Sequence, residues 1–352
     1  MKMKNASGPR RAANFLLALG DVNQRKSPRC FDMCVLSMRT ILIPRTLGIS
    51  LCFLLLCSCA TTPEPSAIIS ASELPADVTI NKDAGRGNLL FVTLRLENGE
   101  ELPFVVDTGM PITVFDKSLE PKLGKRLGPH TILMLGRENE SSVYVAPKLY
   151  LGSTPLMMTG PLILTCDLKQ ISSHSGRSVM GILGMDVLEH YCIQLDFEAW
   201  KMRFLDPDDV NATKLGKAFP LTFSSEGESN MKAIRPFIHH DSLIGGKGTQ
   251  LLIDTGGLVD GVMKPRLPPQ EIRKQRGDVT TGGTAHFPEC VWEGETYTNI
   301  TINTWPIHAQ DPNTLGLRFL ARHLVTLDFP KRTMYLKRTS IGPLVDEGMK
   351  QR

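Results

Sequence analysis

One tripeptide, Asp-Thr-Gly, occurs twice in this chain of 352 residues, and it constrains the fold more than any other feature. The copies occupy residues 107–109 and 254–256. A single Asp-Thr-Gly is a common strand ending, because Asp and Gly both favour turns. Here three bulky apolar residues precede each copy, at 104–106 and 251–253. Two buried strands that each run into a carboxylate and a tight turn suggest one structural unit present twice.

The residues that follow the two copies repeat as well. Gly316 comes 132 residues after Gly184, and the Leu-Asp-Phe sequence at 327–329 comes 132 residues after the one at 195–197. Solenoid repeats are shorter, about 20–50 residues. The offset therefore indicates two copies of a whole domain.

The body of the chain has the pattern of β-structure. Residues 89–96 are rich in β-branched and apolar side chains, and the Asn-Gly at 98–99 is a strong hairpin turn. Further short strands are expected at 142–145, 149–151, 162–164 and 300–302, and a short helix at 187–190. Frequent turns with few long helical periods predict an all-β pair of lobes, with a boundary near 206–209.

The Asp-Thr-Gly strands, the Ile-Leu-Gly-Met-Asp at 182–186 and the Leu-Asp-Phe strands resemble the retropepsin-like aspartic proteases. Two such units in tandem are similar to the bilobal arrangement of pepsin-like enzymes. The resemblance implies an all-β fold of two tandem retropepsin-like (acid protease) β-barrel lobes that form a pseudo-dimer. We expect lobes at residues 83–208 and 209–340, followed by a tail at 341–352.

The resemblance implies that Asp107 and Asp254, called the aspartate pair below, are catalytic. Two carboxyls in contact cannot both stay charged, so they share one proton. The ionised carboxylate can then take a proton from a bound water while the protonated one polarises the substrate carbonyl. This predicts an aspartic endopeptidase, a hydrolase of peptide or protein substrates that needs no cofactor or metal.

Two further pairs of residues have family roles. Thr108 and Thr255 would hydrogen-bond the opposite loop and fix the geometry of the aspartate pair. Gly109 and Gly256 would allow close backbone approach.

Three positions depart from the family pattern. Met110 and Gly257 stand where related enzymes usually have Ser, Thr or Ala, so a hydrogen bond to the ionised pair is missing. We therefore predict a less acid pH optimum than that of pepsin-like enzymes. Arg318 occupies the position that Asp186 has in the first half, so the second lobe has diverged. These departures keep open an alternative, a catalytically inactive bilobal peptide-binding protein.

A mobile hairpin is expected to cover the substrate. Gly136 lies 29 residues after Asp107, and Gly283 lies 29 residues after Asp254. Gly136, Gly282 and Gly283 are therefore flap candidates, since glycine suits a loop that opens and closes. Ordinary hairpin turns are the alternative interpretation.

The N-terminal region reads as a targeting segment. Residues 1–46 hold nine basic and two acidic residues, a net charge of +7, which leaves −3 for the rest of the chain. That slightly acidic body gives no reason to expect nucleic-acid binding. Residues 38–59 have the basic flank, short apolar core and small residues of a secretory signal. Their end resembles a bacterial lipobox, with Cys59 as the lipidated residue. An ordinary signal peptide or short anchor is the alternative.

We therefore expect an exported lipoprotein of the bacterial cell envelope, attached to a membrane and facing the periplasm or exterior. Residues 60–82 would form a flexible linker. Residues 1–37 are a doubtful extension, and we expect translation to begin at Met38.

The remaining polar residues favour structural roles. His239 and His240 are adjacent on an extended segment and so face opposite sides, and Pro288 separates His286 from Cys290. No metal site is expected. Three cysteines remain after processing, which permits at most one disulfide: Cys166, Cys192 and Cys290. Two complete units in one chain predict a monomer, although pairing of lobes between molecules stays open.

Overall fold

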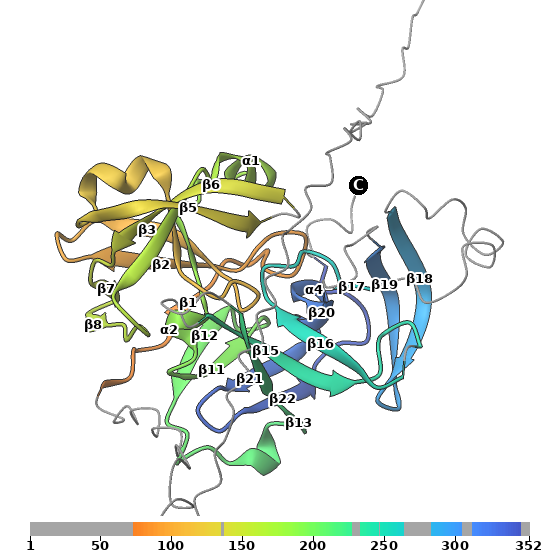
Figure 1. Cartoon of the computed structure of the whole chain (residues 1–352). Coiled ribbons are helices and arrows are strands. Elements are labelled where there is room, and N and C mark those ends of the chain that lie inside the picture. The colour runs from red at the N-terminus through yellow and green to blue at the C-terminus, as the bar shows by residue number, and fades with distance from the viewer. Residues whose placement is uncertain are drawn as a thin grey trace, which may run out of the picture. The chain divides into compact units, whose positions relative to one another are not determined.

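The computed structural model describes residues 73–134, 137–226, 233–245, 247–263, 283–304 and 312–345. Contacts divide the chain into two compact units, Met1–Pro63 and Glu64–Arg352. The second unit is built from three β-sheets and a few short helices, as the all-β prediction requires (Figure 1). None of the helices in the described residues is long and apolar enough to cross a membrane.

The first lobe contains a nine-stranded sheet with the strand order β5-β6-β9-β4-β10-β3-β2-β7-β8. Its strands are β2 (Phe91–Leu96), β3 (Glu101–Val106), β4 (Val114–Asp116), β5 (Arg126–Met134), β6 (Arg137–Val145), β7 (Leu149–Leu151), β8 (Thr154–Pro155), β9 (Leu162–Cys166) and β10 (Gly181–Leu183). The short helices between and after these strands are η2 (Lys117–Lys122), α1 (Lys169–Ser175), α2 (Met185–Leu188) and η3 (Ala212–Lys214). The predicted hairpin turn joins β2 to β3, where Gly99 has a φ of 87° that suits glycine.

The second lobe contains a seven-stranded sheet with the strand order β14-β15-β16-β20-β17-β19-β18. Its elements are β14 (Thr222–Glu226), β15 (Ala233–His240), β16 (Thr249–Asp254), β17 (Gly261–Val262), β18 (Gly283–Trp292), β19 (Glu295–Thr304), β20 (Asn313–Gly316) and the helix α4 (Leu317–Leu320).

The pairing pattern around each Asp-Thr-Gly is the same in both lobes. The strand that ends at the motif runs parallel to the strand before the short helix, β3 beside β10 and β16 beside β20. The strand after the motif pairs antiparallel with that same partner, β4 with β10 and β17 with β20. The duplication inferred from sequence is therefore a duplication of topology.

A third sheet joins the two halves. Its order is β1-β12-β11-β21-β22-β13, and its strands are β1 (Val78–Thr79), β11 (Cys192–Asp196), β12 (Lys201–Leu205), β13 (Lys217–Pro220), β21 (His323–Asp328) and β22 (Thr333–Arg338). The two strands of the Leu-Asp-Phe repeats, β11 and β21, pair antiparallel at its centre (Figure 1). Sequence reasoning did not predict this shared sheet.

The main hydrophobic core runs through both halves. It includes Phe104 and Leu195 from the first half and Leu251 and Val325 from the second, each at most 1% exposed. Burying apolar side chains contributes about 1.5–3 kcal/mol each, so this continuous core stabilises the two lobes as one body.

Candidate active site

The aspartate pair stands at the ends of two buried strands. The residues before each aspartate are almost fully buried, from Phe104 to Val106 and from Leu251 to Ile253. Strands covered on both sides read as continuous apolar runs. β3 ends at Val106 and β16 ends at Asp254, so each aspartate lies at the end of its strand.

The two Asp-Thr-Gly loops hold each other through a reciprocal set of hydrogen bonds. The backbone N–H of Thr108 donates to Oγ1 of Thr255 at 3.0 Å, and that of Thr255 donates to Oγ1 of Thr108 at 3.1 Å. Each hydroxyl then donates to a carbonyl of the other lobe, Thr108 to Ile253 at 2.6 Å and Thr255 to Val106 at 2.8 Å. Both threonines are at most 1% exposed. The structure thus brings the two threonines together, each bonded to the loop of the other lobe.

The carboxyls themselves are held by backbone N–H groups. Gly109 donates to Oδ1 of Asp107 at 2.8 Å, and Gly256 donates to Oδ1 of Asp254 at 3.0 Å. A side-chain hydrogen bond links Asp107 to Asp254. Both aspartates keep part of their surface open to solvent. The pair is therefore fixed in place and still partly accessible to solvent.

The glycines of the two motifs leave room for this contact. A Cβ added to Gly109 would lie 2.9 Å from Oδ1 of Asp254, and one added to Gly256 would overlap the carboxylate of Asp107. A side chain at either position would push the aspartates apart. Close approach, rather than an unusual backbone angle, is what requires glycine here.

Both carboxyls of the pair have raised pKa values. Desolvation by burial is the main cause for each, and backbone N–H donors oppose it. The negative charge of Asp107 raises the pKa of Asp254 further, to about 7. The pair can therefore keep one shared proton toward neutral pH, as general acid–base chemistry on a peptide bond requires.

The loops after the two aspartates are anchored in the same way in both lobes. Met185, at the start of α2, donates its N–H to the carbonyl of Met110 at 2.9 Å. Leu317, at the start of α4, donates its N–H to the carbonyl of Gly257 at 2.7 Å. Each short helix thus fixes the residue that follows its Asp-Thr-Gly motif.

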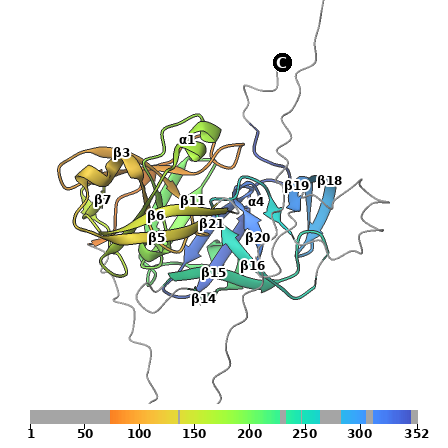
Figure 2. The ribbon, with the colours of Figure 1, turned by 45° about the horizontal axis from the view of Figure 1, so that its top comes forward.

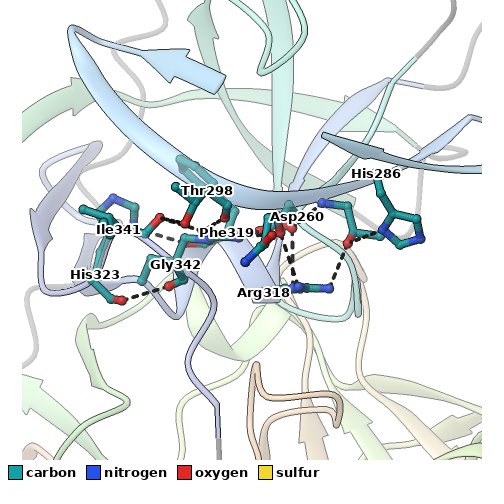
Figure 3. Close-up of polar contacts among 12 residues, drawn as sticks. Asp260, His286, Thr298, Arg318, Phe319, His323, Ile341 and Gly342 are labelled. Carbon is teal, nitrogen blue, oxygen red and sulfur yellow. Dashed lines mark hydrogen bonds and ion pairs between the residues drawn. The ribbon is translucent and has the colours of Figure 1, made fainter. Parts of the chain in front are cut away.

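The side chains that support these loops differ between the lobes. In the first lobe, Oδ1 of Asp186 accepts from the backbone N–H and the hydroxyl of Thr113, at 2.9 and 2.7 Å. In the second lobe, Asp260 stands at the position of Thr113, and Arg318 at that of Asp186. Figure 3 shows the guanidinium of Arg318 pointing toward Asp260, with Nε 3.5 Å from Oδ2.

A second arginine completes the network in the second lobe. Nη2 of Arg322 lies 2.8 Å from Oδ1 of Asp260, and both side chains are fully buried. Arg322 also donates to the carbonyls of Thr298 and Ile341, at 2.8 and 3.0 Å. A buried ion pair persists when its remaining donors are satisfied. The exchange at position 318 is thus matched by an acid at position 260, which sequence reasoning missed because the partners are distant in sequence.

The sequence around the flap candidate Gly136 includes the antiparallel strands β5 and β6 of the first lobe (Figures 1 and 2). Met134 pairs with Arg137 at the end of this hairpin, and Gly136 lies outside the described residues. In the second lobe, Gly283 is the first residue of β18, and Gly282 lies outside the described residues. The flap assignments remain predictions.

The other candidates take structural positions. Nε2 of His240 contacts Glu293, and Nδ1 of His286 lies 3.2 Å from the hydroxyl of Thr301. Among the described residues, no three His, Cys, Asp or Glu side chains gather as a metal site. In that same part of the chain, no disulfide joins Cys166, Cys192 and Cys290. The lipidation candidate Cys59 lies outside the described residues.

Comparison with known proteins agrees with this geometry. Residues 92–187 match the sequence model of the aspartyl protease family, a stretch that runs from β2 to α2 and contains the first Asp-Thr-Gly. Among solved structures, the crystal structure of Basic 7S globulin from soybean is similar. The two sequences are 11% identical and the TM-score is 0.46. The match covers 76% of this chain and 95% of the globulin chain. No curated protein matches the chain. The family resemblance is thus confirmed for residues 92–187, which match the aspartyl protease family.

Proposed function

We propose that this protein is an aspartic endopeptidase whose catalytic groups are Asp107 and Asp254 of one chain. The observation that carries the proposal is the hydrogen-bonded aspartate pair, held by the reciprocal contacts of Thr108 and Thr255. A protein that merely binds peptides has no need of two carboxyls that share a proton.

In the proposed reaction, a water molecule bound between the carboxyls loses a proton to the ionised aspartate and attacks the peptide carbonyl. The protonated aspartate donates a hydrogen bond to the carbonyl oxygen, on which negative charge develops. The proton then passes to the leaving nitrogen. Gly109 and Gly256 hold the carboxylates throughout these steps.

The test is cleavage of a diverse peptide mixture by the purified chain across a range of pH. Asp107→Asn and Asp254→Asn should each abolish cleavage, and a statine inhibitor that mimics the transition state should block it. Asp209→Asn, at an exposed aspartate, is the matched control and should leave cleavage unchanged. A folded chain that cleaves nothing at any pH would favour the peptide-binding alternative, which the missing hydroxyls at Met110 and Gly257 support.

We further propose that the protein is an exported lipoprotein of the bacterial envelope, attached through Cys59. The lipobox-like sequence before Cys59 supports this. Labelling of growing cells with a radioactive fatty acid should mark the wild-type chain and leave Cys59→Ser unmarked. Labelling of both chains, or of neither, would contradict the assignment.

A further inference from the structure

Arg235 lies on the strand next to the one that ends at Asp254. It belongs to β15, which pairs antiparallel with β16, and the paired residues include Phe237 with Leu252. Each step back along one strand of such a pair is matched by a step forward along the other. Phe237 and Leu252 are the last pair, and the same register continued by two steps would bring Arg235 level with Asp254. Residues across from each other direct their side chains to the same face of the sheet.

The first lobe has no charge at the corresponding place. Phe91 of β2 pairs with Val105 of β3, and the same two steps set Leu89 across from Asp107. Leu89 is apolar and 8% exposed. At these matching positions, the strand next to β16 therefore carries a cation, and the strand next to β3 carries a buried hydrocarbon side chain.

The charge of Arg235 acts on the site. Burial and the charge of Asp107 raise the pKa of Asp254, and Arg235 opposes them. The guanidinium is therefore within electrostatic reach of the pair. Arg235 is half-buried, with its Nε shielded from solvent. A guanidinium carries five N–H donors in a planar, fixed arrangement.

We propose that Arg235 determines specificity by binding an acidic side chain of the substrate next to the peptide bond that is cleaved. This inference rests on the proposed endopeptidase function. Guanidinium groups bind carboxylates through two parallel hydrogen bonds, which gives direction as well as strength.

The working pH of the site fits such a substrate. The raised pKa values of the aspartate pair keep its shared proton toward neutral pH. Peptide Asp and Glu side chains, with ordinary pKa values of about 4, are ionised there. In strong acid these side chains would be uncharged, and an arginine would bind them only weakly.

The test uses a randomised peptide library whose cleavage sites are read by mass spectrometry. Wild type should show Asp and Glu enriched beside the cleaved bond. Arg235→Gln should lose the enrichment, Arg235→Lys should keep part of it, and Arg235→Glu should favour Lys and Arg instead. For two peptides that differ only in Glu or Gln at the enriched position, wild-type kcat/KM should be about tenfold higher for the Glu peptide. Lys337→Gln removes an exposed charge from β22 and should not change that ratio.

The failures of the two proposals are distinguishable. Cleavage by wild type without an acidic preference would overturn the role of Arg235 and leave the endopeptidase standing. A ratio that Arg235→Gln leaves unchanged, with only the pH profile shifted, would also overturn it. If wild type cleaves nothing, the same peptide library is bound to the intact chain and the retained peptides are read by mass spectrometry. Enrichment of Asp and Glu that is lost in Arg235→Gln supports binding of an acidic side chain by Arg235, and retention without such enrichment overturns it.

Discussion

Gln194 lies directly opposite Thr326 in the central sheet, and its Nε2 donates to the hydroxyl of Thr326 at 3.0 Å. Thr326 comes 132 residues after Gln194, the same offset that separates Gly184 from Gly316. The two residues are therefore the same position in the two copies of the unit. A position that pairs with its own copy lies on the approximate twofold axis between the halves, as do the reciprocal contacts of Thr108 and Thr255.

This pair predicts a purely structural mutant. Thr326→Val keeps the shape of a side chain that is 0% exposed but removes the acceptor for Gln194. We expect the free energy of unfolding to fall by about 1–2 kcal/mol, the cost of a buried unsatisfied donor. Urea denaturation measures this, and kcat/KM on any cleaved peptide should not change. A large loss of activity at unchanged stability would contradict a structural role.

Thr255→Val should damage both stability and activity. It removes the acceptor of the Thr108 N–H and the donor to the carbonyl of Val106, both in buried surroundings. We expect a loss of about 2–4 kcal/mol and a fall in kcat of about 10²-fold, because the aspartates lose their mutual geometry. Thr255→Ser keeps the hydroxyl and should behave nearly as wild type. Equal effects of Val and Ser would show that the hydroxyl is not the cause.

Gly257→Ser should move the acid limb of the pH–rate profile to lower pH. A Cβ at this position lies 3.0 Å from Oδ2 of Asp254, so a serine hydroxyl can donate to that carboxylate. Hydrogen bonds to the charged form lower a carboxyl pKa, and we expect a shift of about one pH unit. Gly257→Ala adds the same Cβ without the hydroxyl and should leave the limb in place. A shift of equal size in the alanine variant would contradict this explanation.

Asp186→Asn should stabilise the protein at neutral pH. Asp186 is 3% exposed, and burial raises its pKa from 3.8 to about 7. Between these values the unfolded chain has lost the proton that the native state keeps, so this group makes stability fall as pH rises. Asparagine removes that contribution.

The expected gain is about 2–4 kcal/mol at pH 8, with little difference near pH 4. Urea denaturation at the two pH values measures it. The raised pKa values of the aspartate pair also make the free energy of unfolding fall as pH rises, in the variant as in wild type. The variant is therefore compared with wild type at each pH. A variant that is less stable than wild type at both pH values would contradict a neutral, protonated Asp186.

Much of the fold could be predicted because the informative residues repeat locally. The apolar run before each Asp-Thr-Gly predicts a buried strand on its own. Finding it twice, together with the 132-residue offset of Gly184 and Gly316, predicts the duplication. The contacts of Thr108 and Thr255 followed from the family resemblance.

The parts that were missed depend on pairings between distant residues. In the sequence alone, Arg318 suggests that the second lobe has lost the interaction that Asp186 makes in the first. Its partner Asp260 is 58 residues away and belongs to no recognisable motif. The strand of Arg235 pairs with the strand that ends at Asp254, and sequence does not determine this register locally. The central sheet was missed for the same reason, since the Leu-Asp-Phe strands do not show that they pair with each other.

The most direct test of the single-chain aspartate pair is the activity of Asp107→Asn, of Asp254→Asn and of their equimolar mixture. If both aspartates of one chain form one site, each variant is inactive and the mixture stays inactive, because no chain in it holds both carboxyls. Activity in either variant alone, or recovery of activity on mixing, would contradict the account and show that lobes of different molecules assemble the site.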